Sequence, residues 1–175
     1  MQRIIFFMTI SLLLSISALG RTKLSISKST MQLGGTIQMP IKILKGQEAQ
    51  IGFLISPEFN YFVGKSFALG LSPSVGRTSI SGNNSPWQFS LASTAKYYID
   101  LGGALYPYLG VKAGIDWQTK TEGVNFLLGA PIGILVPLNN RVALDLGAPL
   151  NFYFNKDGYI GARIPIGYLG IAAFF

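Results

Sequence analysis

"LYPYLGVKAGIDWQTK", residues 105–120, alternates large apolar side chains with small or polar ones. Leu109, Val111 and Ile115 belong to the apolar set, whereas Lys112 and Asp116 belong to the set between them. A period of two residues predicts a β-strand whose successive side chains point to opposite faces. The strand therefore has an apolar face and a polar face, and the fold depends on which of the two meets water.

The same alternation recurs along the chain, in eight segments altogether: 30–39, 49–62, 67–75, 87–99, 105–120, 124–138, 141–155 and 159–175. The connections between them are of two kinds. Tight turns at 63–65, 100–104 and 139–140 alternate with more charged connectors at 40–48, 81–85, 120–123 and 156–158. This order predicts an all-β protein, an eight-stranded antiparallel up-and-down barrel with a short-turn end and a charged end.

The composition indicates an exported and unusually apolar chain. Of its 175 residues, 49% are hydrophobic and 12% are charged, about half the charged share of a soluble domain. Residues 1–20 combine Arg3, a long apolar run and the small residues Ala18 and Gly20, which predicts a signal peptide cleaved near Gly20. The apolar run is shorter than a membrane-anchoring helix requires. The barrel domain is then expected over 21–175.

Such a barrel has two possible environments. A secreted lipocalin-like barrel turns its apolar face inward around a lipid-like ligand, whereas a transmembrane barrel turns it outward. In this chain the apolar faces hold full-size side chains on all eight segments, and the opposite faces are rich in Gly, Ser, Ala and Asn. An eight-stranded barrel has room only for side chains in its lumen. The pattern therefore favours a transmembrane β-barrel, with the lipocalin-like barrel as an alternative.

Aromatic residues on the apolar faces gather near the strand ends, as in the two interfacial belts of membrane barrels. The set near the short turns is Tyr61, Phe67 and Tyr97, and the set near the charged connectors is Trp87, Trp117, Phe152 and Phe154.

The chain ends in "GYLGIAAFF", residues 167–175, with apolar residues alternating up to Phe175. This stretch resembles the C-terminal strand of bacterial outer-membrane proteins, and the resemblance implies that the barrel-assembly machinery reads it as an assembly signal. Upstream, Gly161 and Arg163 share the parity of Phe175, so the strand must swap its faces. A bulge near Gly167 would produce that swap.

The phrases "SPEFNYFVGKSFALGL" (56–71) and "YPYLGVKAGI" (106–115) also resemble the small outer-membrane β-barrel domains of the OmpX/OmpA type. The resemblance is strongest to the versions found in Bacteroidetes-like bacteria and covers residues 24–175. It implies the architecture and an outer-membrane location. It implies no single activity, because the family contains structural, adhesive and uncharacterised members.

The residue inventory argues against catalysis. The chain contains no His and no Cys, which excludes a Ser-His-Asp or Cys-His site, a typical zinc site and disulfides. A carboxylate-based or Ser/Tyr-based enzyme is not excluded by this count, but no constellation for one is visible. We expect no enzyme activity, no cofactor and no metal. Nucleic-acid binding has no support beyond the net charge of +7.

Ionisable residues on the lumen faces comprise three acids and three bases: Glu58, Lys96, Lys112, Asp116, Asp145 and Arg163. Counting along the strands places Glu58, Lys96 and Asp145 at one height, and Asp116 with Arg163 nearer the charged end. Because buried charge is costly unless it is paired, we expect a layered network of ion pairs. Such a network acts either as a plug or as a gated ion path.

The charged connectors gather basic residues at one end: Lys42, Lys45, Arg77, Lys120 and Lys156. If that end lies outside the cell, these residues could pair with lipopolysaccharide phosphates; ordinary solvated loop charge is the alternative. The sequence as a whole predicts a bacterial outer-membrane barrel with a structural, envelope-stabilising or interaction role. A narrow pore and a secreted lipid-binding barrel are the other two hypotheses.

Overall fold

The computed structural model describes residues 23–45, 50–79, 86–102, 105–119, 123–156 and 158–175. The predicted signal peptide lies outside these ranges. No helix within them is long and apolar enough to cross a membrane.

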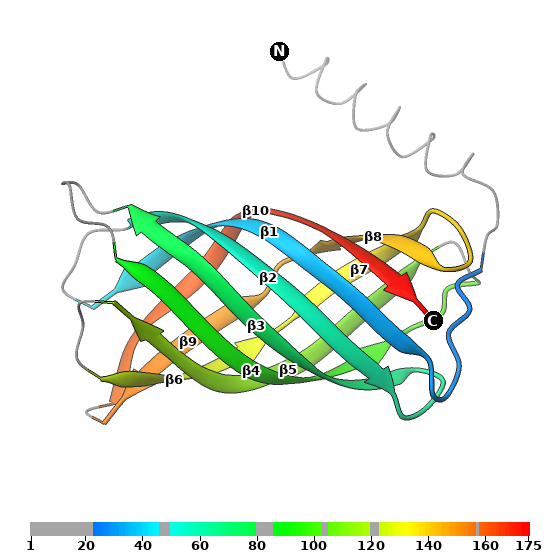
Figure 1. Cartoon of the computed structure of the whole chain (residues 1–175), viewed down its shortest axis with the longest axis horizontal. Helices are drawn as coiled ribbons and strands as arrows, with labels where there is room; N and C mark the ends of the chain where they lie inside the picture. The colour runs from blue at the N-terminus through cyan, green and yellow to red at the C-terminus, as the bar shows by residue number, and fades with distance from the viewer. Residues whose placement is uncertain (1–22, 46–49, 80–85, 103–104, 120–122, 157) are drawn as a thin grey trace, which may run out of the picture.

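Ten strand elements make up a single antiparallel sheet (Figure 1). They are β1 (Met31–Leu44), β2 (Gln50–Phe62), β3 (Phe67–Ser79), β4 (Trp87–Tyr98), β5 (Tyr106–Gln118), β6 (Val124–Ala130), β7 (Ile132–Pro137), β8 (Val142–Gly147), β9 (Leu150–Asn155) and β10 (Gly158–Phe174).

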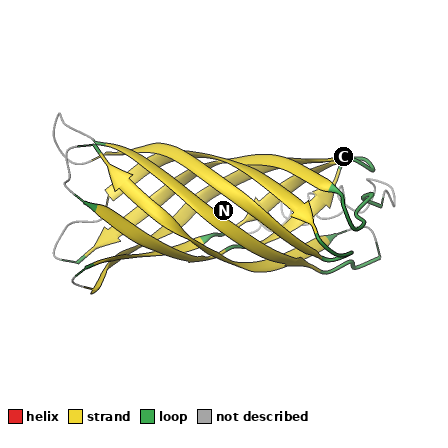
Figure 2. Ribbon diagram, turned by 60° about the horizontal axis from the view of Figure 1, so that its bottom comes forward, coloured by secondary structure: helices red, strands yellow, loops and turns green. Residues whose placement is uncertain are grey.

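The ten elements occupy eight positions around a closed ring. β6 and β7 both pair with β5, so together they form one strand with a break. In the same way β8 and β9 both pair with β10 and form a second broken strand. The breaks fall at Pro131 and at Ala148–Pro149, where proline has no N–H to donate to a ladder. β1 pairs with β10 and closes the ring. The predicted eight-stranded up-and-down barrel is confirmed, and Figure 2 shows its tilted strands.

The predicted change of face in the last strand is confirmed. Met39 pairs with Gly167 and Pro40 pairs with Pro165, which leaves residue 166 without an opposite partner. Before this bulge the odd-numbered Arg163 is buried, and after it the even-numbered Ala172 and Phe174 are buried. The ladder also shows that β1 continues to Leu44, so the connector expected over 40–48 begins later than predicted.

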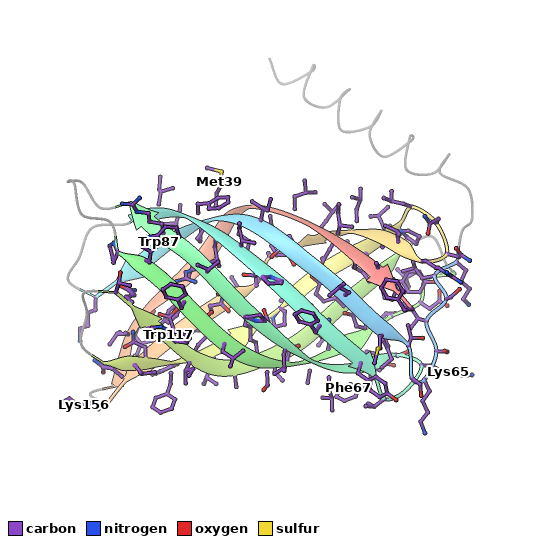
Figure 3. The ribbon with its side chains drawn as sticks, viewed as in Figure 1. Met39, Lys65, Phe67, Trp87, Trp117 and Lys156 are labelled. Carbon is purple, nitrogen blue, oxygen red and sulfur yellow. The ribbon has the colours of Figure 1, made fainter. Side chains whose placement is uncertain are left out.

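Large apolar side chains cover the outside of the barrel all the way round (Figure 3). Val111 is 66% exposed, for example, whereas its neighbour along β5 toward the charged end, Lys112, is half-buried. Glutamine, serine, threonine and asparagine side chains point inward and are buried. This arrangement is the one expected for a barrel in lipid and the reverse of a lipocalin.

A segment ahead of β1 closes the short-turn end. Leu24 is 3% exposed, and its backbone N–H donates to the Tyr106 hydroxyl at 3.2 Å. The N–H of Ser25 donates to the carbonyl of Asn140 at 2.9 Å, across the mouth of the barrel. Lys23 pairs with Asp100 at 2.8 Å, and this hydrogen-bonded carboxylate raises the pKa of Lys23. The segment is thus tied to the start of β5, to the turn before it and to the turn between β7 and β8.

Candidate functional site in the lumen

An apolar layer fills the lumen at the short-turn end. It consists of Leu24, Phe62, Ala68, Tyr98, Tyr106, Tyr108, Leu135, Ala143, Ala172 and Phe174. The ring centroids of Phe62 and Tyr98 lie 5.2 Å apart, and those of Tyr98 and Tyr108 lie 5.4 Å apart.

At this end the lumen therefore holds large aromatic side chains as well as the small and polar ones that the sequence indicated. Phe62 and Tyr98 have the same parity as the polar residues that precede them on their strands, and Phe174 shares the parity of Ala172 beyond the bulge, so the pleat turns all three inward. They fit because alanines lie among them.

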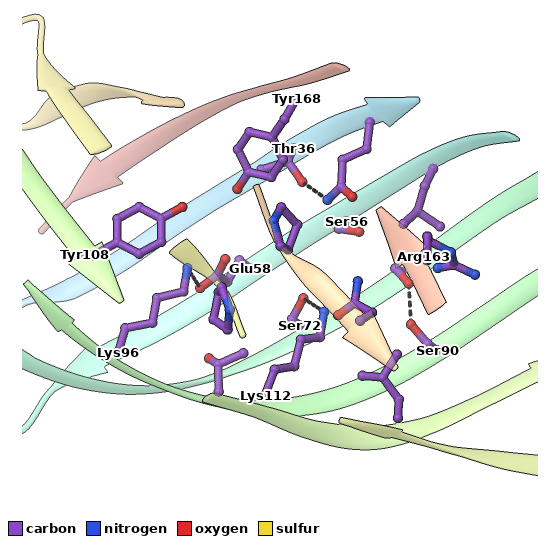
Figure 4. A pocket seen from close by; sticks show the side chains of 18 residues that line it. Thr36, Ser56, Glu58, Ser72, Ser90, Lys96, Tyr108, Lys112, Arg163 and Tyr168 are labelled. Carbon is purple, nitrogen blue, oxygen red and sulfur yellow. Dashed lines mark hydrogen bonds and ion pairs between the residues drawn. The ribbon is translucent and has the colours of Figure 1, made fainter. Parts of the chain in front are cut away.

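The first charged layer lies next to the aromatic one and is centred on Lys96 (Figure 4). Its ammonium pairs with Glu58 at 2.5 Å and lies 4.7 Å from the ring centroid of Tyr108. The Tyr108 hydroxyl donates to Asp145 at 2.7 Å, and the Tyr168 hydroxyl donates to the other oxygen of the same carboxylate at 3.2 Å. Strands β2, β4, β5, β8 and β10 are therefore linked across the lumen.

A second charged layer lies toward the charged end. Both oxygens of Asp116 accept hydrogen bonds from the Gln88 amide, at 2.8 and 2.6 Å. Arg163 approaches the same carboxylate to 4.0 Å, and its guanidinium lies 5.0 Å from the ring centroid of Tyr153. Asp116 is 0% exposed, so these polar contacts replace the water that a carboxylate would otherwise bind.

All six ionisable residues predicted for the lumen thus lie inside the barrel, and the five whose heights were counted from the sequence fall into the two layers. Lys112, for which no height was counted, donates from its ammonium to a neutral partner, the Ser72 hydroxyl, at 3.0 Å. The polar cavity among these side chains has a volume of about 30 Å³, the space of roughly one water molecule. The lumen is a packed core of charged and polar groups.

Four residues that hydrogen-bond the lumen carboxylates were not among the predicted site residues: Asn60, Gln88, Tyr108 and Tyr168. Gln88 and Tyr108 share the inward parity of their strands, so alternation placed them in the lumen without indicating a partner. Tyr168 follows the bulge, and its inward direction depends on where that bulge falls.

The predicted aromatic belts lie at opposite ends of the outer surface. Figure 3 shows Phe67 at the short-turn end, with Trp87 and Trp117 toward the other. Tyr61, Tyr97 and Phe152 are exposed as well, whereas Phe154 is half-buried and packs against Tyr159 with centroids 5.7 Å apart.

Three of the five basic residues expected at the charged end have described, exposed side chains: Lys45, Arg77 and Lys156. The Arg77 guanidinium lies 5.9 Å from the Trp87 ring centroid. The side chain of Lys42 and the whole of Lys120 lie outside the described residues.

The predicted assembly signal forms part of the seam that closes the ring. Phe175 points outward and is 72% exposed. Its N–H donates to the carbonyl of Met31 at 2.9 Å, and the N–H of Met31 donates back to the carbonyl of Phe175 at 3.0 Å.

Comparisons with known proteins identify the fold. No protein-family model matches the sequence, and neither does any curated protein. Among solved structures, the chain is similar to Neisserial surface protein A, at 14% identity and a TM-score of 0.68, over 83% of this chain and 96% of that one. It is also similar to Ail of Yersinia pestis, at 14% identity and a TM-score of 0.51, over 85% and 99% of the two chains. The outer membrane protein OprG of Pseudomonas aeruginosa matches at 9% identity and a TM-score of 0.50, over 89% and 98%. At these identities the likeness shows a shared fold, that of small outer-membrane barrels.

Proposed function

We propose that this protein is a bacterial outer-membrane barrel with a structural, envelope-stabilising or interaction role, and that it neither catalyses a reaction nor conducts ions. One observation carries the proposal: the outer surface is apolar on every strand, while the lumen is filled. A closed barrel leaves no unpaired edge strand in lipid, so such a wall is stable in a bilayer. With a filled lumen, the contacts available to partners lie on the outer surface and at the two ends.

The lumen supports the plug over the gated ion path. The apolar layer and the Leu24 segment close the short-turn end, and each charged layer is held by hydrogen bonds or an ion pair. Passage of a hydrated ion would require both barriers to rearrange.

Two partners fit the ends of the barrel. Lipopolysaccharide phosphates fit the basic end, where Lys45 and Lys156 are exposed. The barrel-assembly machinery fits the outward-facing C-terminal strand that ends in Phe175. The absence of His supports a non-enzymatic role, because the common hydrolytic constellations of membrane barrels need one.

The first test is the mobility of the outer-membrane fraction on a detergent gel, boiled and unboiled. We expect the unboiled protein to migrate as a compact, detergent-resistant species and the boiled protein to migrate at its unfolded position. Recovery of the mature protein in the soluble periplasmic fraction, with no shift, would overturn the proposal in favour of a lipocalin-like barrel.

The second test is single-channel recording in planar bilayers, which addresses the pore hypothesis. We expect no conductance above background from the parent protein. Steady conductance that changes in Glu58→Ala or Arg163→Ala would overturn the plug and support a pore controlled by the charged layers.

A further inference from the structure

Two neighbouring strands are broken at the same height in the barrel wall. β6 gives way to β7 at Pro131, and beside it β8 gives way to β9 at Ala148–Pro149. Gly133 and Gly147 face each other in the register just beyond the breaks. One bond bridges the gap, from the Ala148 N–H to the Ile132 carbonyl at 2.7 Å. This part of the wall therefore combines a discontinuous ladder with residues that have little or no side chain.

A groove of about 590 Å³ opens at this place on the outer surface. Its rim is formed by lipid-facing side chains: Ile99, Leu109, Ile132, Ile134 and Leu146. Gly133, Gly147 and Ala148 form the floor. None of the described residues that line the groove is charged.

The floor is one side chain thick. Tyr108 and Tyr168 line the groove on one side and the polar cavity of the lumen on the other. A Cβ added at Gly133 would lie 2.5 Å from the Tyr108 hydroxyl, and one added at Gly147 would lie 2.7 Å from it. Glycine is needed at both positions because the tyrosine lies directly against the backbone. Both tyrosine hydroxyls donate to Asp145, so they have no hydrogen left for a ligand in the groove.

We infer that this groove binds one acyl chain of a phospholipid, in the membrane leaflet at the short-turn end. The inference rests on the proposed membrane location. The rim is continuous with the lipid-facing belt, and Leu109 pairs with Tyr97 of the short-turn aromatic belt, which sets the depth. Water would find few hydrogen-bond partners among these residues, and an empty groove would forfeit dispersion contacts. A flexible hydrocarbon chain is the occupant that the surrounding bilayer supplies.

The test uses the mature chain in detergent, freed of lipid and titrated with 1-palmitoyl-2-oleoyl-phosphatidylethanolamine under native mass spectrometry. Ala148→Trp fills the groove from its exposed floor residue without entering the lumen, and Ala148→Leu fills it with a smaller side chain. Ala113→Trp is the matched control, because Ala113 is also exposed on the outer surface but does not line the groove.

We expect the parent and Ala113→Trp to retain one lipid with a saturable Kd, and Ala148→Trp to bind at least about tenfold more weakly. Equal binding by all three, binding that does not saturate, or a dimer in place of the bound lipid would overturn the site. The boiling shift separates this inference from the proposed function. A parent protein that shifts but binds no lipid refutes the groove alone, whereas one that shows no shift refutes both.

Discussion

At the scale of single residues, Lys96 has the most consequential contacts in the lumen. It is 2% exposed, pairs with Glu58 and lies over the ring of Tyr108, whose hydroxyl in turn holds Asp145. Removing one member of a buried pair leaves the other charge without compensation, and that penalty exceeds what the intact pair contributes.

We therefore expect Lys96→Met to lower the free energy of unfolding by about 3–5 kcal/mol, because it leaves the Glu58 carboxylate inside the lumen without its ion-pair partner. Urea unfolding in lipid vesicles, followed by the gel-mobility shift, measures the change. Lys112→Met is the matched control and should cost less, since the partner of Lys112 is the neutral Ser72 hydroxyl.

The double variant Glu58→Gln/Lys96→Met isolates the pair. It removes both charges and should recover much of the stability lost in Lys96→Met. If Lys96→Met unfolds at the same urea concentration as the parent, the buried pair does not stabilise the barrel.

A second prediction at this scale concerns Gly114, a glycine on the lumen face of β5. A Cβ at Gly114 would overlap the Leu91 carbonyl oxygen and the Ala92 Cα of the adjacent strand, whereas one at Gly64 would meet nothing within 4 Å. We expect Gly114→Ala to destabilise the barrel by about 1–3 kcal/mol through overpacking. Gly64→Ala, assayed by the same unfolding method, should stay within about 0.5 kcal/mol of the parent. Equal stabilities would show that the two strands move apart at no cost.

At the scale of elements, the segment ahead of β1 belongs to the folded barrel. Leu24 enters the aromatic layer, and the backbone of the segment bonds to Tyr106 and Asn140. Two other local features also shape whole strands. Pro131 and Pro149 each interrupt a strand, and the bulge at residue 166 exchanges the inward and outward faces of β10.

We expect Leu24→Ala to lower the free energy of unfolding by about 2–5 kcal/mol, because it leaves a cavity in the apolar layer. Leu33→Ala is the matched control. Leu33 is 46% exposed on the outer face of β1, where lipid tails take the place of the lost atoms. Equal losses in the two variants would mean that the segment merely rests on the barrel.

At the scale of the whole molecule, the two ends differ in chemistry. The short-turn end is closed by the apolar layer, and the other end carries exposed basic residues, among them Arg77 over Trp87 and Lys156 (Figure 3). If lipopolysaccharide is the partner at the basic end, loss of charge there should matter more than the same loss at the opposite end.

We expect Lys45→Ala/Lys156→Ala to weaken binding to lipopolysaccharide micelles by roughly fivefold at low salt, as two exposed ion pairs would. The difference should shrink at higher ionic strength because exposed charges are screened. Lys28→Ala/Lys65→Ala removes the same charge from exposed sites at the short-turn end and should bind like the parent. Equal weakening by both double variants would show that binding depends on the net charge of the protein and not on the basic end.

The sequence alone determined the barrel, its eight strand positions and the direction of nearly every side chain. The reason is local: in a strand the pleat alternates the faces, so parity assigns Val111 to the outside and Asp116 to the lumen without reference to any other strand. Even the bulge in β10 was visible, because Arg163 and Phe175 share a parity but not a face.

Tertiary structure alone decided which side chains meet. The bonds from Tyr108 and Tyr168 to Asp145, and from Gln88 to Asp116, join strands whose registers depend on every turn and bulge between them. The Leu24 segment has no alternation to reveal its place, and the groove exists only because the breaks at Pro131 and at Ala148–Pro149, in consecutive strands, fall side by side in the wall. Alternation is a property of one strand, whereas contact across a closed barrel is a property of all of them together.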